Sequence, residues 1–214
     1  MGRKPQRRTK ERILETALAL FNRLGEPSVT PSAIAEEMGI SPGNLHYHFP
    51  SKDKIVEALF ATFRAEIERT LAAPGTRAPD VEDVWLFLHL IFEAIWKYRF
   101  VYRDITALVS RHRGLERQMR LILAHKQTTA ATILRGLVAE GRMTASASDI
   151  EALAANMTLI ATWWLSFEYV RDPRHWDDGE ALARGAYQVM ALAAPYLAPR
   201  ERALLDHLAE RYRS

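Results

Sequence analysis

The side chains best suited to hydrogen bonding with another molecule lie between residues 41 and 52. Asn44 carries an amide that donates and accepts in one plane, a geometry that matches an adenine edge and is worth ~1–3 kcal/mol of discrimination between bases. Pro42 and Gly43 are small, so the start of a helix at this point can approach another surface closely. Free N–H groups and the positive dipole at such a helix start attract phosphate. The combination indicates contact with a nucleic acid.

Two short amphipathic helices joined by a tight turn must position these side chains. The first helix is predicted to begin at the N-cap Thr30, and the turn is predicted at Gly39, because glycine accepts a left-handed backbone. The second helix is predicted to begin at the cap Ser41 and to bury Leu45 and Phe49. Its outward residues are then Gly43, Asn44, His46 and Tyr47. This is the plan of a helix-turn-helix whose second helix enters a DNA major groove.

The stretch from Gly39 to Lys52 resembles the DNA-binding segment of the TetR/AcrR family of bacterial one-component regulators. The residues that match the family pattern are Gly39, Ile40, Ser41, Leu45, Tyr47, His48, Phe49, Ser51 and Lys52. The specific resemblance covers residues 9–60, and beyond them only chain length and helix layout are similar.

The resemblance, together with the helix pattern, implies that eight residues bind DNA: Thr30, Ser41, Pro42, Gly43, Asn44, His46, Tyr47 and Lys52. Tyr47 and Lys52 match positions that commonly contact the DNA backbone. His46 departs from the family, in which an aromatic residue is more frequent there, although an imidazole can still hydrogen-bond a phosphate or a base. Taken alone, Asn44 also suits the first turn of a helix, and Tyr47 also suits packing on its neighbours.

Composition and charge limit the class of protein. The chain has 214 residues, 48% of them hydrophobic, and no cysteine, so thiolate chemistry and disulfides are excluded and a cytoplasmic location is expected. Residues 1–55 contain nine Lys/Arg against six Asp/Glu, whereas the remaining residues contain twenty of each. The net charge of +3 therefore comes from the predicted DNA-reading end. A solubilising N-terminal tail is one interpretation, but the position beside a helix-turn-helix favours contact with phosphate.

Helical periodicity continues along the rest of the chain, and no strand pattern is convincing. The predicted fold is all-α with about nine or ten helices: an N-terminal three-helix head joined by a long helix to a C-terminal helical bundle. The predicted domains are a disordered basic arm (1–8), a helix-turn-helix DNA-binding domain (9–55) and a ligand-binding and dimerisation domain (56–214).

Large apolar side chains in the C-terminal region suggest a ligand cavity, which the family also has. The predicted lining residues are Trp85, Phe92, Trp96, Tyr102, Met119, Trp163 and Phe167. Such a pocket favours a largely hydrophobic or aromatic effector. Aromatic residues at helical spacing also fit plain core packing. No cofactor is expected, and a metal site at His46 and His48 is not expected either, because residues two apart on a helix face different directions.

The segments near 148–171 and 178–194 resemble the dimerisation helices of the family. Two such helices from each subunit would form a four-helix bundle about a two-fold axis. Completion of the monomer core is the alternative. A dimer is favoured because one helix-turn-helix contacts too few bases for useful specificity.

The leading hypothesis is a homodimeric transcriptional repressor that binds an operator in double-stranded DNA and is released by a small, largely hydrophobic effector. The alternative is an α-helical small-molecule carrier or enzyme, which only the aromatic-rich C-terminal region supports. No enzymatic function is expected, since the sequence contains no Gly-rich phosphate loop, no Glu-x-x-His pair and no nucleophile elbow.

Overall fold

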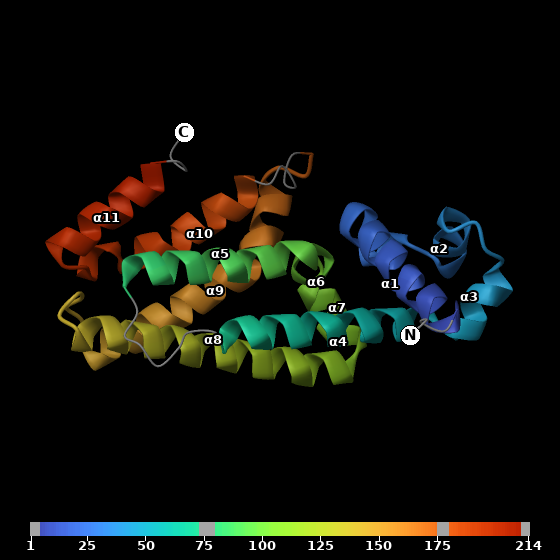
Figure 1. Cartoon of the computed structure of the whole chain (residues 1–214), viewed down its shortest axis with the longest axis horizontal. Helices are drawn as coiled ribbons and strands as arrows, with labels where there is room; N and C mark the ends of the chain where they lie inside the picture. Colours follow the sequence, from blue (N-terminus) through green and yellow to red (C-terminus); the bar gives the residue numbers. More distant parts are fainter. Residues whose placement is uncertain (1–4, 73–79, 175–179, 211–214) are drawn as a thin grey trace. The chain divides into compact units, whose positions relative to one another are not determined.

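The computed structural model describes residues 5–72, 80–174 and 180–210 (Figure 1). The α-helices in these ranges are α1 (Pro5–Leu24), α2 (Pro31–Glu37), α3 (Pro42–His48), α4 (Lys52–Leu71), α5 (Val81–Lys97), α6 (Arg99–Arg103), α7 (Ile105–Arg111), α8 (Arg113–Ala139), α9 (Ala147–Arg171), α10 (Glu180–Ala193) and α11 (Pro199–Ala209). Two 3-10 helices also occur, η1 (Glu26–Ser28) and η2 (Ala194–Tyr196). The predicted all-α fold is confirmed.

The helix count exceeds the predicted nine or ten because the segment 99–111 forms two helices. Phe100, Val101 and Tyr102 of α6 are all buried, and three consecutive residues cannot share one face of a helix. The chain leaves the helical region at Asp104, with φ −108° and ψ 20°. Helix α7 then begins at Ile105 and buries Ile105 and Leu108.

Helix α1 begins earlier than predicted. It starts at Pro5, whereas the predicted DNA-binding domain begins at residue 9. Residues 5–8 of the predicted disordered arm belong to this helix, while residues 1–4 lie outside the described residues. Proline suits the first helical position, and the glutamine and arginines that follow have high helix propensity.

The chain forms two compact units. The first consists of Met1–Ala65 and Tyr98–Glu116, and the second consists of Glu66–Lys97 and Arg117–Ser214. The predicted domain boundary falls between residues 55 and 56, whereas the first unit continues to Ala65. The first unit also includes α6 and α7, which associate with the N-terminal helices. Helices α4 and α8 each begin in the first unit and continue into the second.

Aromatic contacts hold α6 in the first unit. The ring of Phe100 lies 5.4 Å from that of Phe21 in α1, and the backbone N–H of Phe100 donates to Asn22 Oδ1 at 3.1 Å. Phe63 of α4 contacts the rings of Tyr98 and Tyr102, both at a centroid distance of 5.6 Å. These residues are far apart in sequence, so periodicity alone does not reveal their association.

Close packing of α9 against α10 organises the second unit. A Cβ added at Gly185 would lie 2.6 Å from ring atoms of Phe92 and Trp164, so only glycine allows this approach. Trp164 Nε1 donates to the carbonyl oxygen of Ala181 at 2.6 Å, and Arg184 pairs with the buried Glu168 at 2.7 Å. Across the described ranges, no helix has both the length and the apolarity that crossing a membrane requires.

Candidate nucleic-acid interface and ligand cavity

Side-chain caps define the helix-turn-helix in the first unit. Thr30 Oγ1 accepts from the backbone N–H of Ala33 at 3.1 Å, and Ser41 Oγ accepts from the N–H of Asn44 at 3.2 Å. Gly39 occupies the turn with φ 64°, a left-handed conformation that favours glycine. The predicted helix starts and the predicted turn are confirmed.

Helix α3 is anchored on one side and open on the other. Leu45 and the following Phe49 are buried, as predicted. The outward side chains are exposed, and Tyr47 retains 72% of its accessible surface. An added Cβ at Gly43 would meet only Ser41 Oγ, at 4.0 Å. The structure therefore brings Pro42, Gly43, Asn44, His46 and Tyr47 together on one accessible helix, and their contact with DNA remains a prediction.

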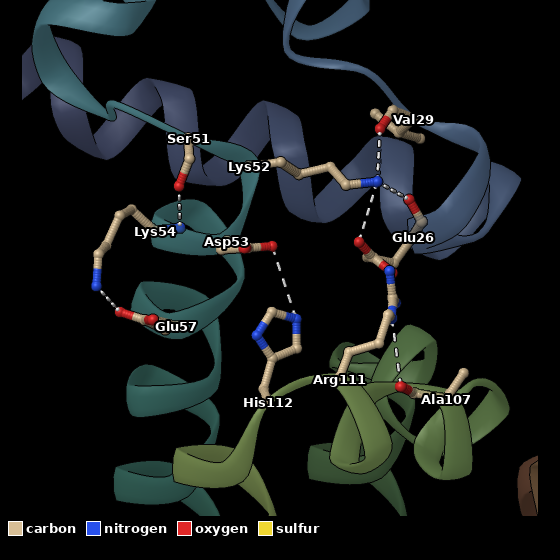
Figure 2. Close-up of polar contacts among 10 residues, drawn as sticks. All are labelled: Glu26, Val29, Ser51, Lys52, Asp53, Lys54, Glu57, Ala107, Arg111 and His112. Carbon is tan, nitrogen blue, oxygen red and sulfur yellow. Dashed lines mark hydrogen bonds and ion pairs between the residues drawn. The ribbon is translucent and has the colours of Figure 1, made fainter.

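Lys52 faces inward in this structure, whereas the resemblance implied that it contacts the DNA backbone. Its ammonium donates to the carbonyl oxygens of Glu26 at 2.9 Å and Val29 at 3.1 Å (Figure 2). It also forms an ion pair with Glu26 Oε1 at 3.0 Å. Two hydrogen bonds to carbonyl oxygens and one ion pair therefore hold the Lys52 ammonium on the inner side. Lys52 thus holds the start of α4 against the loop that precedes α2.

Glu26 is the centre of this inward cluster. Its side chain is fully buried and pairs with Lys52 on one side and with Arg111 of α7 on the other (Figure 2). Burial by itself would raise the pKa of Glu26, but hydrogen bonds and charges from Arg111 and Lys52 outweigh it and lower the pKa below its ordinary value. Glu26 therefore carries a buried negative charge that links η1, α4 and α7.

Two lysines near α3 are better candidates for phosphate contact than Lys52. Lys10 and Lys54 are exposed and line a shallow depression with His48 and Pro50. Lys10 Nζ lies 5.1 Å from the ring centroid of Phe49, and Lys54 pairs with Glu57 at 2.6 Å. The excess of basic residues in the N-terminal region predicted contact with phosphate, but it did not indicate which lysines face outward.

A cavity does occur in the second unit, but the seven predicted residues do not line it. Its walls come from the end of α4, from α5, α8, α9 and α10, and from Leu197. On α5 the lining face includes Val84, Leu88 and Ile91. Trp85 follows Val84, and Phe92 follows Ile91. Successive residues of a helix are rotated by about 100°, so neither aromatic side chain shares the face that lines the cavity.

The remaining predicted lining residues are also absent from the wall of this cavity. Tyr102 belongs to the core of the first unit, and Met119 and Trp96 lie on helix segments away from the cavity wall. Trp163 and Phe167 are exposed on α9, whereas the cavity-lining residues of that helix are Met157, Thr158 and Ala161. The second unit thus contains an apolar cavity, and residues other than the seven predicted ones form its walls.

The exposed side of α9 carries an apolar stripe. Leu159, Trp163, Phe167 and Val170 recur at intervals of three or four residues and are all exposed. A continuous apolar stripe of this size is typical of a protein contact surface. Helix α10, whose described part begins at Glu180, packs beside α9; residues 178 and 179 of the predicted segment lie outside the described residues.

An all-α chain with a capped helix-turn-helix belongs to the class of helix-turn-helix proteins. Residues 13–59 match the model described as bacterial regulatory proteins, tetR family, and residues 62–205 match the model described as bacterial transcriptional repressor of the TetR type. This chain therefore belongs to the tetR family of bacterial regulatory proteins.

Individual relatives agree with this assignment. The crystal structure of a TetR-family transcriptional regulator from Marinobacter aquaeolei VT8 is 32% identical, covers 96% of this chain and 99% of that chain, and has a TM-score of 0.86. The ketosteroid transcriptional regulator KstR2 of Mycobacterium tuberculosis shares the fold, with 21% identity, coverage of 89% and 95% of the two chains and a TM-score of 0.62.

Curated relatives match over shorter stretches. The probable HTH-type transcriptional regulator YttP of Bacillus subtilis is 28% identical over 106 residues, which are 46% of this chain and 51% of that protein. The match spans about half the length of this relative.

Proposed function

We propose that this protein is a homodimeric, sequence-specific DNA-binding transcriptional regulator, and that it acts as a repressor released by a small apolar effector. The observation that carries the DNA-binding role is the accessible polar side of α3 within a helix-turn-helix that its own caps and buried anchors hold in shape. Membership of the tetR family supports the same role.

Within this proposal the exposed residues divide into two groups. Asn44 reads a base edge, and Tyr47 and His46 add contacts to bases or to the backbone. Lys10 and Lys54 supply phosphate contacts in place of Lys52, because their ammonium groups are exposed around α3.

Replacement of Asn44 by alanine is expected to weaken binding to a specific duplex by about 5- to 150-fold for each half-site that the dimer contacts, which corresponds to ~1–3 kcal/mol per half-site. The probes are duplexes that the wild-type protein selects from a random library, and the measurement is a titration at several salt concentrations. Tyr47→Ala is expected to weaken binding as well. Gln127→Ala, an exposed polar residue of α8, is the control and should bind as the wild type does.

The salt dependence separates base contacts from phosphate contacts. Asn44→Ala should leave the slope of log affinity against log salt unchanged, whereas Lys10→Gln and Lys54→Gln should each reduce it by about two, because each substitution removes one phosphate contact from both subunits of the dimer. Unchanged binding of the selected duplex by Asn44→Ala and Tyr47→Ala together would refute the assignment of α3 as the reading helix.

The exposed apolar stripe supports dimerisation through α9 and α10. Leu159→Glu is expected to weaken the dimer at least about 100-fold, since a carboxylate buried in an apolar interface loses its hydration and a symmetric dimer contains the substitution twice. Sedimentation equilibrium measures this effect. Leu121→Glu is a matched control, because Leu121 on α8 is 58% exposed and Leu159 is 54% exposed. Equal dissociation of both variants, or of neither, would contradict the proposed interface.

The cavity of the second unit is the proposed effector site. Helix α4 begins at Lys52, beside the buried Glu26, and ends at Leu71, which lines the cavity. Helix α4 therefore contains the Lys52 ion pair with Glu26 at its start and a residue of the cavity wall at its end. An effector can shift DNA affinity only by its differential affinity for two states of the protein. If the chain binds small molecules but selects no duplex, the alternative of a carrier or enzyme gains support.

A further inference from the structure

The wall of the cavity in the second unit offers almost no polar surface. The cavity volume is about 70 Å³, well above the roughly 10–15 Å³ that a single water requires. Among the described residues that line it, only Lys126 of α8 and Thr158 of α9 have polar side chains. The accessible surface of the cavity is nevertheless almost wholly apolar, so the polar atoms of these two side chains contribute almost nothing to it.

The positions of the two polar groups agree with this surface. Lys126 is 5% exposed, and its Nζ lies 3.4 Å from Oγ1 of Thr162, a residue outside the cavity wall. The Oγ1 atom of Thr158 is itself buried. A molecule in the cavity would therefore contact the methylene stem of Lys126 and the methyl group of Thr158.

Aliphatic side chains make up most of the remaining wall. Phe87 of α5 is the one aromatic residue among the described lining residues. Met157 and Met190 also line the cavity, and their flexible side chains adapt to the shape of a ligand. Such a wall attracts a ligand by removing apolar area from water and by dispersion, and it offers no hydrogen bond.

We propose that this cavity binds a neutral molecule whose enclosed part is purely hydrocarbon, and that it discriminates against molecules of the same shape with a hydroxyl or a charged group there. This inference rests on the proposed function, since it narrows the chemical class of the effector for the same cavity. A hydroxyl in place of a methyl group would lose its hydrogen bonds to water and find no partner in the wall. An ionised group would lose still more hydration.

The test compares molecules that differ by a methyl group against a hydroxyl, by isothermal titration calorimetry on the full chain without DNA. The pairs are toluene with phenol and ethylbenzene with benzyl alcohol. We expect the wild-type protein to bind the better-fitting hydrocarbon at least about tenfold more tightly than its hydroxyl counterpart. Benzene is expected to bind about fourfold more weakly than toluene, because it has one carbon group fewer to bury.

Four variants locate the binding. Ala161→Leu on α9 and Ala193→Leu on α10 place extra carbon atoms in the cavity, so each should strongly weaken hydrocarbon binding. Val189→Thr replaces a lining methyl group by a hydroxyl of similar size, so it should reduce the preference for toluene over phenol severalfold. Ala124→Leu changes an exposed alanine of α8 and is the control, which should bind as the wild type does.

Several results would overturn the proposal. These are no binding of any hydrocarbon probe, a hydroxyl compound bound as tightly as its counterpart, or hydrocarbon binding that survives in both Ala161→Leu and Ala193→Leu. The last result would assign the hydrocarbon to another apolar surface, such as the exposed stripe of α9. Duplex binding is measured separately. Absence of hydrocarbon binding with intact duplex selection rejects this inference alone, and hydrocarbon binding without duplex selection rejects the proposed function.

Discussion

Replacement of Glu26 by glutamine is expected to destabilise the folded head by about 3–5 kcal/mol, because removal of one partner leaves buried charges uncompensated. Lys52 and Arg111 would then face a neutral amide in place of a carboxylate that is fully buried. Because this cluster joins the loop before α2 to α4 and α7, the loss should loosen the whole helix-turn-helix. DNA binding should fall with it, although Glu26 itself does not reach the surface.

Hydrogen exchange of the amides in α2 and α3 is the suitable measurement. All five tryptophans lie at or beyond residue 85, so tryptophan fluorescence reports mainly on other parts of the chain. Glu37→Gln is the control, because Glu37 forms an exposed ion pair with Arg23 at 4.0 Å, and such surface pairs contribute about 0–1 kcal/mol. Equal protection in the two variants would show that the Glu26 cluster does not stabilise the head.

The lowered pKa of Glu26 also predicts an acid dependence. A carboxyl whose folded pKa is below its unfolded value binds fewer protons when folded, so the stability it contributes is present above the unfolded pKa of about 4.5. That stability is lost as the pH falls through the lowered folded pKa. Head unfolding in acid should therefore begin at a higher pH in Glu26→Gln than in the wild-type protein.

Replacement of Lys126 by methionine is expected to stabilise the second unit on the order of 4 kcal/mol at pH 7. The wild-type chain must bury an amine whose pKa falls from 10.5 to about 7, whereas methionine fills a similar volume without a charge to desolvate. Between pH 7 and 10.5 the unfolded chain binds more protons at this lysine than the folded chain does, so wild-type stability should rise with pH across that window. This rise should be absent from the variant.

Urea denaturation followed by tryptophan fluorescence at pH 7 and pH 10 measures both effects. Lys97→Met provides the control, because the Lys97 ammonium is exposed and pairs with Glu66 at 2.7 Å. A Lys126→Met variant that is no more stable than the wild type at pH 7 would show that the buried amine carries little energetic cost.

The helix-turn-helix could be predicted from sequence because its determinants are local. Thr30 and Ser41 each accept a hydrogen bond from a residue three positions ahead, and Gly39 alone supplies the left-handed turn. The alternation of buried and exposed positions on α3 follows helical spacing, so Leu45 inside and Tyr47 outside were both predicted correctly. Capping and periodicity act over one or two turns, and they are readable in a single sequence.

The tertiary structure decided everything that depends on which helix face meets which neighbour. Lys52 is directed inward by oxygens of Glu26 and Val29, more than twenty positions earlier in the chain. Trp163 is exposed while Lys126 is buried at a cavity, the reverse of what their hydrophobicity suggests. Periodicity identifies an apolar face, but the orientation of that face toward a cavity, a core or a second subunit depends on packing between distant segments.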